Sequence, residues 1–152
     1  MKFLTQGIVF SEIPDEITLE LGISNCPFRC EGCHSPFLQQ DVGTKLTLEV
    51  LRELIENNDG ISCILFSGGS PKEVEEACHY ISILYPDIKT AWYTGMETIP
   101  TDLNLDYFDY IKVGPYKKDL GGLRNPNTNQ KLYKKDKNDK WENITYKFWK
   151  WF

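Results

Sequence analysis

Three cysteines close together are the clearest chemical signal in this sequence. Cys26, Cys30 and Cys33 form a C-x3-C-x2-C pattern, and His34 follows directly. Three thiolates from one short loop can bind three corners of an iron–sulfur cube and leave the fourth iron without a protein ligand. By analogy with open zinc sites, a reactive centre requires such an open metal position. The spacing therefore favours a reactive iron–sulfur cluster.

Two other kinds of site remain open for this cluster of cysteines. A structural zinc ion needs a fourth ligand, but His34 adjoins Cys33, and no second cysteine pair follows at the spacing of a zinc module. A dithiol redox pair could use Cys30 and Cys33, which leaves Cys26 without a role. Spacing alone favours iron–sulfur over zinc, and zinc over a dithiol.

The use of cysteine and the lengths of the apolar segments indicate the cellular compartment of the protein. Cys63 falls in an apolar run and Cys78 on an apolar helical stripe, so we expect both in the core. Five cysteines, three of them clustered, do not suit a secreted disulfide scaffold. No apolar run approaches the ~18 residues of a membrane span, and residues 1–10 are too short for a secretory signal. We expect a cytoplasmic protein without a membrane partner.

Strands and helices are predicted to alternate along the chain, which implies βαβ units and a parallel sheet. With 152 residues, a full eight-fold barrel of ~250 residues does not fit. The predicted fold class is therefore α/β: a single-domain partial (β/α) barrel with a mostly parallel sheet and a short C-terminal extension. The strands are predicted over 16–23, 61–66, 88–93 and 107–113, and one helix near 47–57 behind Thr47. A second helix is predicted after the turn at 67–71, with an apolar stripe of Val74, Ala77, Cys78, Ile81 and Leu84.

The cysteine loop after the first predicted strand resembles that of the radical S-adenosylmethionine superfamily. In that superfamily the three cysteines bind one 4Fe-4S cluster per chain, and S-adenosylmethionine chelates its fourth iron. The resemblance implies that Cys26, Cys30 and Cys33 are the cluster ligands. It places Gly32, Cys33 and His34 near the nucleoside end of the cofactor. It implies no catalytic residue beyond the cluster and the cofactor.

A Gly-Gly turn follows the second predicted strand, in the segment S-G-G-S-P over residues 67–71. It is similar to the Gly-Gly-Glu-Pro-like turn that meets the methionine amino group in the same superfamily. The resemblance implies that Gly68, Gly69 and Ser70 bind the cofactor. Ser70 and Glu73 also form a Ser-x-x-Glu capping box, with a proline at N1, which any helix could use. Both interpretations can hold together.

A third motif resembles activating proteins of the anaerobic (class III) ribonucleotide reductase. Residues 113–116 carry a Gly-Pro-aromatic step, and Gly122-Leu123-Arg124 and Thr128-Asn129-Gln130 match the Leu-Arg…Asn-Gln signature that follows it. The resemblance covers about residues 15–133 and predicts a radical S-adenosylmethionine domain over 1–133.

The resemblance implies an activating enzyme that reductively cleaves S-adenosylmethionine at a 4Fe-4S cluster. The enzyme would generate a glycyl radical on the large subunit of anaerobic ribonucleoside-triphosphate reductase. A low-potential donor such as flavodoxin or ferredoxin is expected to supply the electron. Two alternatives stay open. An activase of another glycyl-radical enzyme, of the formate-lyase type, would keep every site residue, whereas a zinc-stabilised binding module would not be an enzyme.

Residues 134–152 form a basic, aromatic tail after the predicted domain. Residues 111–152 carry 11 Lys/Arg and 4 Asp/Glu, whereas residues 1–110 carry 6 and 18. Such a surface suits an anionic partner, although solvated lysines alone would give the same pattern. Aromatic and basic residues together also suit nucleic acid. Covering the domain or meeting a protein partner is the favoured interpretation, and no nucleic-acid partner is expected.

Overall fold

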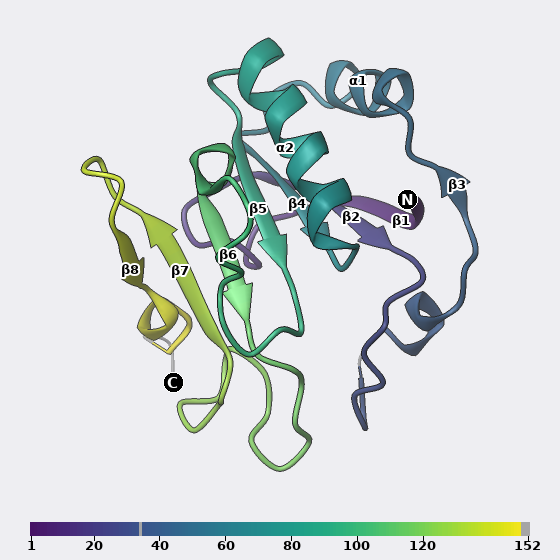
Figure 1. Cartoon of the computed structure of the whole chain (residues 1–152). Coiled ribbons are helices and arrows are strands. Elements are labelled where there is room, and N and C mark those ends of the chain that lie inside the picture. The colour runs from purple at the N-terminus through teal and green to yellow at the C-terminus, as the bar shows by residue number, and fades with distance from the viewer. Residues whose placement is uncertain (34, 150–152) are drawn as a thin grey trace.

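The computed structural model describes residues 1–33 and 35–149. In this part of the chain one eight-stranded sheet has the order β3-β1-β2-β4-β5-β6-β7-β8 (Figure 1). The strands are β1 (Lys2–Val9), β2 (Thr18–Ile23), β3 (Thr44–Lys45), β4 (Cys63–Ser67), β5 (Lys89–Tyr93), β6 (Tyr110–Val113), β7 (Lys131–Lys135) and β8 (Trp141–Asn143). The helices are α1 (Leu48–Glu56) and α2 (Pro71–Leu84), with 3₁₀ helices η1 (Pro36–Gln39), η2 (Leu105–Tyr107) and η3 (Thr145–Phe148).

The centre of the sheet is parallel and its two sides are antiparallel. Strands β2, β4, β5 and β6 pair in parallel, whereas β1 and β3 on one side and β7 and β8 on the other pair antiparallel. The predicted α/β class is confirmed, and the sheet stays open rather than closing into a barrel. The expectation of a mostly parallel sheet holds only for these four central strands. The outer four strands were not predicted.

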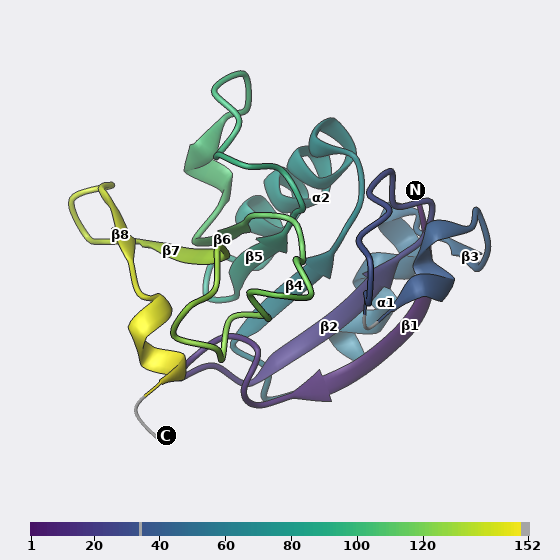
Figure 2. The same ribbon diagram turned by 90° about the horizontal axis from the view of Figure 1, so that it is seen from below.

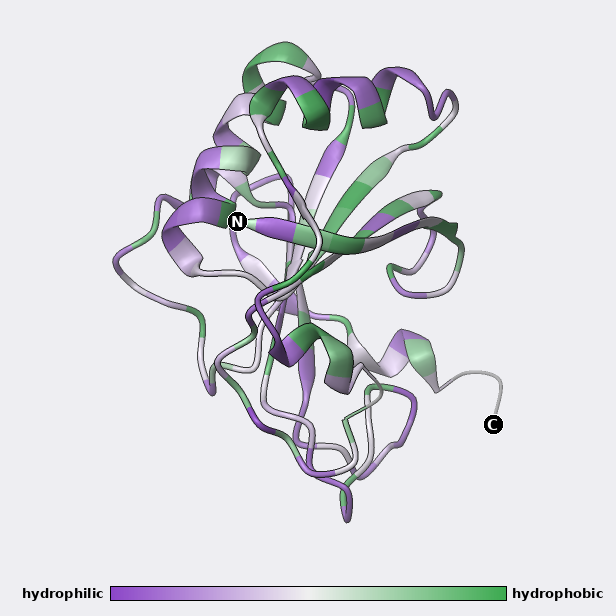
Figure 3. Ribbon diagram, turned by 90° about the vertical axis from the view of Figure 1, so that its right-hand side faces the viewer, coloured by the Kyte–Doolittle hydropathy of each residue, from purple (hydrophilic) through white to green (hydrophobic). Residues whose placement is uncertain are grey.

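One face of the sheet is covered by both helices. Thr47 is the N-cap of α1, as predicted, and its Oγ1 accepts a hydrogen bond from the Val50 N–H at 3.1 Å. In Figure 3, apolar and hydrophilic residues alternate along the helices, as expected for helices with one buried side. The buried residues of the helices pack against alternate residues of the strands. This core includes Leu19, Leu21, Ile23, Leu51, Ile55, Ile64, Phe66, Val74, Ala77, Cys78, Ile81 and Trp92.

The opposite face of the sheet carries a second, smaller core. Its buried members are Ile13, Cys63, Leu65, Ala91, Tyr110, Leu132 and Ile144. Cys63 and Cys78 are therefore both buried, as predicted, one on each face of the sheet. Burial raises the pKa of both thiols far above the ordinary value, so both act as small apolar core residues.

The C-terminal segment packs against this second face. The boundary predicted after Tyr133 falls inside β7, and the N–H of Leu132 donates to Thr145 Oγ1 at 2.9 Å. Lys147 forms an ion pair with Asp15 at 3.2 Å, which places η3 beside the segment that joins β1 to β2 (Figure 2). The division into a domain and a tail stays a prediction, as does the role of the tail toward a partner.

No helix in residues 1–33 and 35–149 has both the length and the apolar character of a membrane span.

Candidate functional site

A cavity of about 800 Å³ lies at the carboxyl ends of the four parallel strands. Open parallel α/β sheets bind their ligands at this edge, and the volume is that of a small-molecule site. Each parallel strand contributes the loop that follows it. The lining includes Cys26, Cys30 and Cys33 after β2, Gly68 and Gly69 after β4, Thr94 and Gly95 after β5, and Tyr116, Gly122, Leu123, Arg124 and Gln130 after β6.

The cysteine loop brings all three clustered thiols to this cavity. Cys26, Cys30 and Cys33 are free and half-buried. The Cys26 N–H donates to the Leu38 carbonyl at 2.9 Å, and the Cys33 N–H donates to the Cys30 carbonyl at 3.2 Å. The Ser35 N–H donates to Cys33 Sγ at 3.4 Å. These backbone bonds fix the loop without using a thiol as a donor, so all three thiols stay available as ligands.

The cysteine loop lies over the loops that follow β5 and β6. A Cβ on Gly95 would come within 2.8 Å of the Phe28 ring, so Phe28 packs where only a glycine leaves room. Gly32 has a φ of +73°, and a Cβ there would meet Tyr116 Cε1 at 3.4 Å. Gly32 does not line the cavity, and its predicted contact with a nucleoside stays a prediction.

The Gly-Gly turn after β4 has a conformation that requires glycine at both positions. Gly68 and Gly69 have φ values of +98° and +94°. A Cβ on Gly68 would lie 3.2 Å from the Ile23 carbonyl oxygen, and a Cβ on Gly69 would lie 2.9 Å from Val74 Cγ2. Since L side chains rarely adopt such φ values, the two glycines allow this close approach of the turn to the end of β2.

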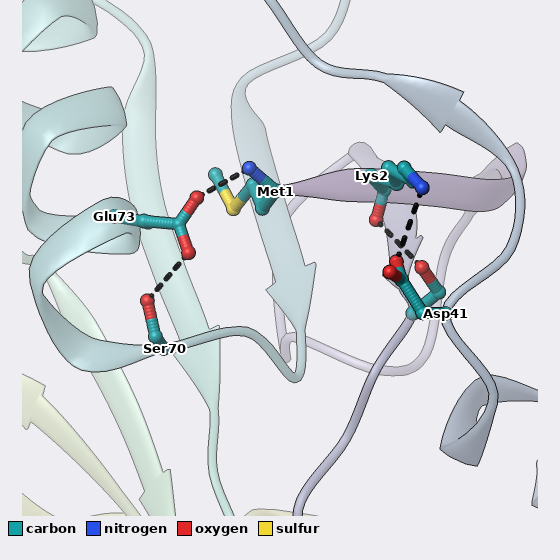
Figure 4. Close-up of polar contacts among 6 residues, drawn as sticks. Met1, Lys2, Asp41, Ser70 and Glu73 are labelled. Atoms are coloured by element: carbon teal, nitrogen blue, oxygen red, sulfur yellow. Dashed lines mark hydrogen bonds and ion pairs between the residues drawn. The ribbon is translucent and has the colours of Figure 1, made fainter.

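Ser70 lies outside the cavity, at the start of α2. Ser70 is the N-cap and Pro71 stands at N1, as predicted. The prediction of a capping box is wrong, because the Ser70 side chain does not accept the capping hydrogen bond. The Ser70 hydroxyl donates to Glu73 Oε1 at 2.9 Å instead of accepting from its N–H. The other Glu73 oxygen pairs with the N-terminal ammonium of Met1 (Figure 4). The bonds from Met1 and Ser70 lower the pKa of Glu73.

The Gly-Pro step and the Asn-Gln pair of the third motif are the two ends of a single loop. Gly114 has a φ of +101°, and a Cβ there would lie 3.1 Å from Gln130 Cα. Asn129 Nδ2 donates to the Pro115 carbonyl at 3.0 Å, and Gln130 Nε2 donates to the Gly114 carbonyl at 3.4 Å. The Gly-Pro step and the Asn-Gln pair therefore close the loop that borders the cavity, which explains why they occur together.

Sequence reasoning missed Lys112, a buried lysine of the cavity lining. Lys112 stands in the apolar run of β6 and is only 8% exposed. Burial lowers the pKa of Lys112 to about 8, although the nearby Cys30, Cys26 and Cys33 oppose the change. A charged residue between Ile111 and Val113, in a strand expected to be buried, is the signal that could have identified it.

Sequence reasoning also missed Glu20 and Tyr93, which line the same cavity. Burial raises the pKa of Glu20, and the charge of Glu12 raises it further. Ser67 Oγ donates to Glu20 Oε1 at 3.2 Å and partly opposes the rise. Tyr93 Oη donates to the Glu12 carbonyl, so the segment that precedes β2 is tied to this wall of the cavity.

The three clustered cysteines are the candidate ligands of a metal centre in this cavity. Among residues 1–33 and 35–149, no three Cys, His, Asp or Glu side chains surround a point that one metal ion could occupy. In a 4Fe-4S cluster each thiolate binds a different iron, so its ligands stand around a larger space. Cys26, Cys30 and Cys33 around one cavity could hold such a cluster. His34 lies outside the described residues, and its predicted role is not tested.

Comparison with known proteins gives the family. No curated protein and no solved structure matches the chain. The profile of the 4Fe-4S single cluster domain family matches residues 17–120, about two thirds of the chain. The matched segment contains the three clustered cysteines, the Gly-Gly turn and Lys112. The chain therefore belongs to the 4Fe-4S single cluster domain family.

Proposed function

We propose that the protein is a cytoplasmic radical S-adenosylmethionine enzyme that generates a glycyl radical on anaerobic ribonucleoside-triphosphate reductase. One observation carries the proposal: the clustered cysteines and the Gly-Gly turn come from different loops and line one cavity. When bound, a 4Fe-4S cluster with S-adenosylmethionine supplies a one-electron reductive cleavage that yields methionine and a 5′-deoxyadenosyl radical.

The residues of this chain have three tasks in the proposed reaction. The thiolates of Cys26, Cys30 and Cys33 would hold the 4Fe-4S cluster and would leave one iron without a protein ligand, open to the cofactor. Gly68 and Gly69 would let the backbone approach the methionine end of the cofactor, because neither carries a side chain. The loops that follow the parallel strands would surround the reacting groups and limit their contact with water.

The loop of residues 114–130 supports the choice of partner. This loop carries the signature that resembles the reductase activases, and it contributes Tyr116, Arg124 and Gln130 to the cavity lining. Arg124 Nη2 donates to Ser11 Oγ at 2.7 Å, so the exposed Arg124 lies where the loop meets the segment after β1. We infer that the glycine-bearing loop of the reductase enters beside residues 114–130.

An electron paramagnetic resonance experiment tests the partner. Anaerobically reconstituted protein is reduced in the presence of S-adenosylmethionine and mixed with the large subunit of the reductase. The proposal predicts a glycyl-radical signal on the reductase and none on a formate-lyase type enzyme in a parallel mixture. A signal only on the formate-lyase type enzyme would reassign the partner. Replacing the chemical reductant by reduced flavodoxin or ferredoxin tests the expected electron donor.

A further inference from the structure

Lys112 is a buried lysine in the wall of the cavity. It is 8% exposed, and its Nζ donates to the Gly114 carbonyl at 3.2 Å. The same Nζ lies 5.5 Å from the centroid of the Tyr93 ring, its cross-strand neighbour on β5. Within residues 1–33 and 35–149, no Asp or Glu forms an ion pair with Lys112. A carbonyl and a ring face compensate only part of the loss of hydration that burial imposes on an ammonium group.

As thiolate ligands, the three clustered cysteines would be the anionic groups that act on Lys112. Lys112 and all three cysteines line the same cavity. The charges of Cys30, Cys26 and Cys33 are the interactions that favour the ammonium form of Lys112. Glu20 lines the cavity as well, but burial favours its neutral form, and Ser67 already donates to it. The ammonium of Lys112 therefore lies in the wall of the cavity that the proposed cluster ligands also line.

We propose that Lys112 is the buried counter-charge of the cluster and raises its reduction potential. One-electron reduction adds one negative charge to the cluster, the electron comes from a low-potential donor, and no bond forms or breaks. A fixed positive charge in a buried site stabilises the reduced state more than the oxidised state. The contacts of Lys112 with Gly114 and Tyr93 hold this charge in place. The inference rests on the cluster of the family and does not require S-adenosylmethionine.

The test compares the reduction potentials of charge-removing and charge-keeping variants. The full chain is reconstituted anaerobically, its iron and sulfide are measured, and a redox titration is carried out without S-adenosylmethionine. In K112M and K112Q we expect the ratio of reduced to oxidised cluster at a fixed potential to fall about tenfold, which corresponds to about 59 mV for one electron. K112R is expected to keep the wild-type potential.

Lys134 provides a matched control. It stands on β7, and its Nζ lies 5.7 Å from the ring centroid of Tyr110, but it does not line the cavity. K134M should therefore leave the potential unchanged. A wild-type potential in fully loaded K112M would overturn the proposal, as would an equal shift in K112R and K112M.

Loss of the cluster from the neutral variants would still decide the question. If K112M and K112Q lose iron, a K112R protein that keeps both iron and potential supports the counter-charge. Loss of iron from K112R to the same extent would overturn it, because a restored charge would then have no effect. A shifted potential in a protein that does not cleave S-adenosylmethionine would support Lys112 as the counter-charge and contradict only the proposed function.

Discussion

Trp92 Nε1 donates a hydrogen bond to the carbonyl oxygen of Gly68 at 3.0 Å. Trp92 is fully buried beneath the helices, whereas Gly68 lines the cavity at the carboxyl edge of the sheet. The Gly68 N–H donates to the Tyr93 carbonyl at 2.9 Å, so two successive residues of β5 fix both polar groups of this glycine. A buried indole N–H requires an acceptor, and here the core positions the Gly-Gly turn before any ligand binds.

We predict that G68A is destabilised by about 1–2 kcal/mol, because alanine is strained at a positive φ. The added Cβ would also lie 3.2 Å from the Ile23 carbonyl oxygen and push the turn away from β2. The free energy of unfolding in urea should fall, and cleavage of S-adenosylmethionine should slow. G7A is the control, because a Cβ on Gly7 would meet no atom within 4 Å. Unchanged stability and cleavage in G68A would contradict the role given to this turn.

The assignment of the cluster ligands predicts the iron content of cysteine variants. Each of C26S, C30S and C33S should lose most of the about four irons expected per chain, because each removes one thiolate ligand. C63A and C78A are matched controls in the two cores and should keep the cluster while losing stability. Anaerobic iron and sulfide analysis measures the outcome. A C26S protein with a full cluster would contradict the assignment of Cys26 as a ligand.

The half-buried Glu20 predicts a pH dependence of stability. Burial raises the pKa of Glu20 in the folded state above its ordinary value of about 4.5, so the folded protein binds this proton more readily than the unfolded chain. Stability contributed by Glu20 is therefore lost as the pH rises from about 4.5 through the raised pKa. Relative to wild type, E20Q should gain stability over that interval in denaturant titrations at successive pH values.

The control for this pH dependence is Glu142, which is exposed on β8. E142Q removes a carboxylate that remains in contact with water, so it should give no such gain in stability over the same interval. If the free energies of unfolding of wild type and E20Q differed by the same amount at every pH, the raised pKa of Glu20 would be contradicted.

Thr145 predicts a stability effect in the C-terminal segment. Its Oγ1 accepts a hydrogen bond from the N–H of the fully buried Leu132 at 2.9 Å. T145V removes the acceptor and leaves a buried N–H unpaired, which should lower the free energy of unfolding by about 1–3 kcal/mol. T145S keeps the hydroxyl and should restore most of the loss. Thermal and urea unfolding measure both, and equal stability of T145V and T145S would show that the hydroxyl is dispensable.

The centre of the fold could be predicted from the sequence and its sides could not. The alternation of Leu19, Leu21 and Ile23 identified the buried face of β2, because strand side chains point to opposite faces in turn. In β7 only Leu132 is fully buried among lysines and a tyrosine, so its five residues resemble a polar loop. β7 is paired on both sides, with β6 and β8, and its charged residues hide the alternation that identifies a strand in a sequence.

The candidate site could be predicted only where residue types are distinctive. Three cysteines and two glycines at fixed spacing stand out along one chain, and the structure brings all five to one cavity. Lys112 and Tyr93 lie there because the register of the parallel strands aligns Gly22, Ser67, Tyr93 and Lys112 in one row. A sequence without strand register does not show which residues of different strands become neighbours.

The most direct test of the proposed function is anaerobic reconstitution followed by reduction with dithionite in the presence of S-adenosylmethionine. The absorption spectrum, the iron and sulfide content, and the amount of 5′-deoxyadenosine released are measured on the same sample. The account predicts about four irons per chain, loss of visible absorbance on reduction and release of 5′-deoxyadenosine, all abolished in C30A. One zinc per chain, no visible absorbance and no nucleoside release would contradict it and leave a zinc-stabilised binding module.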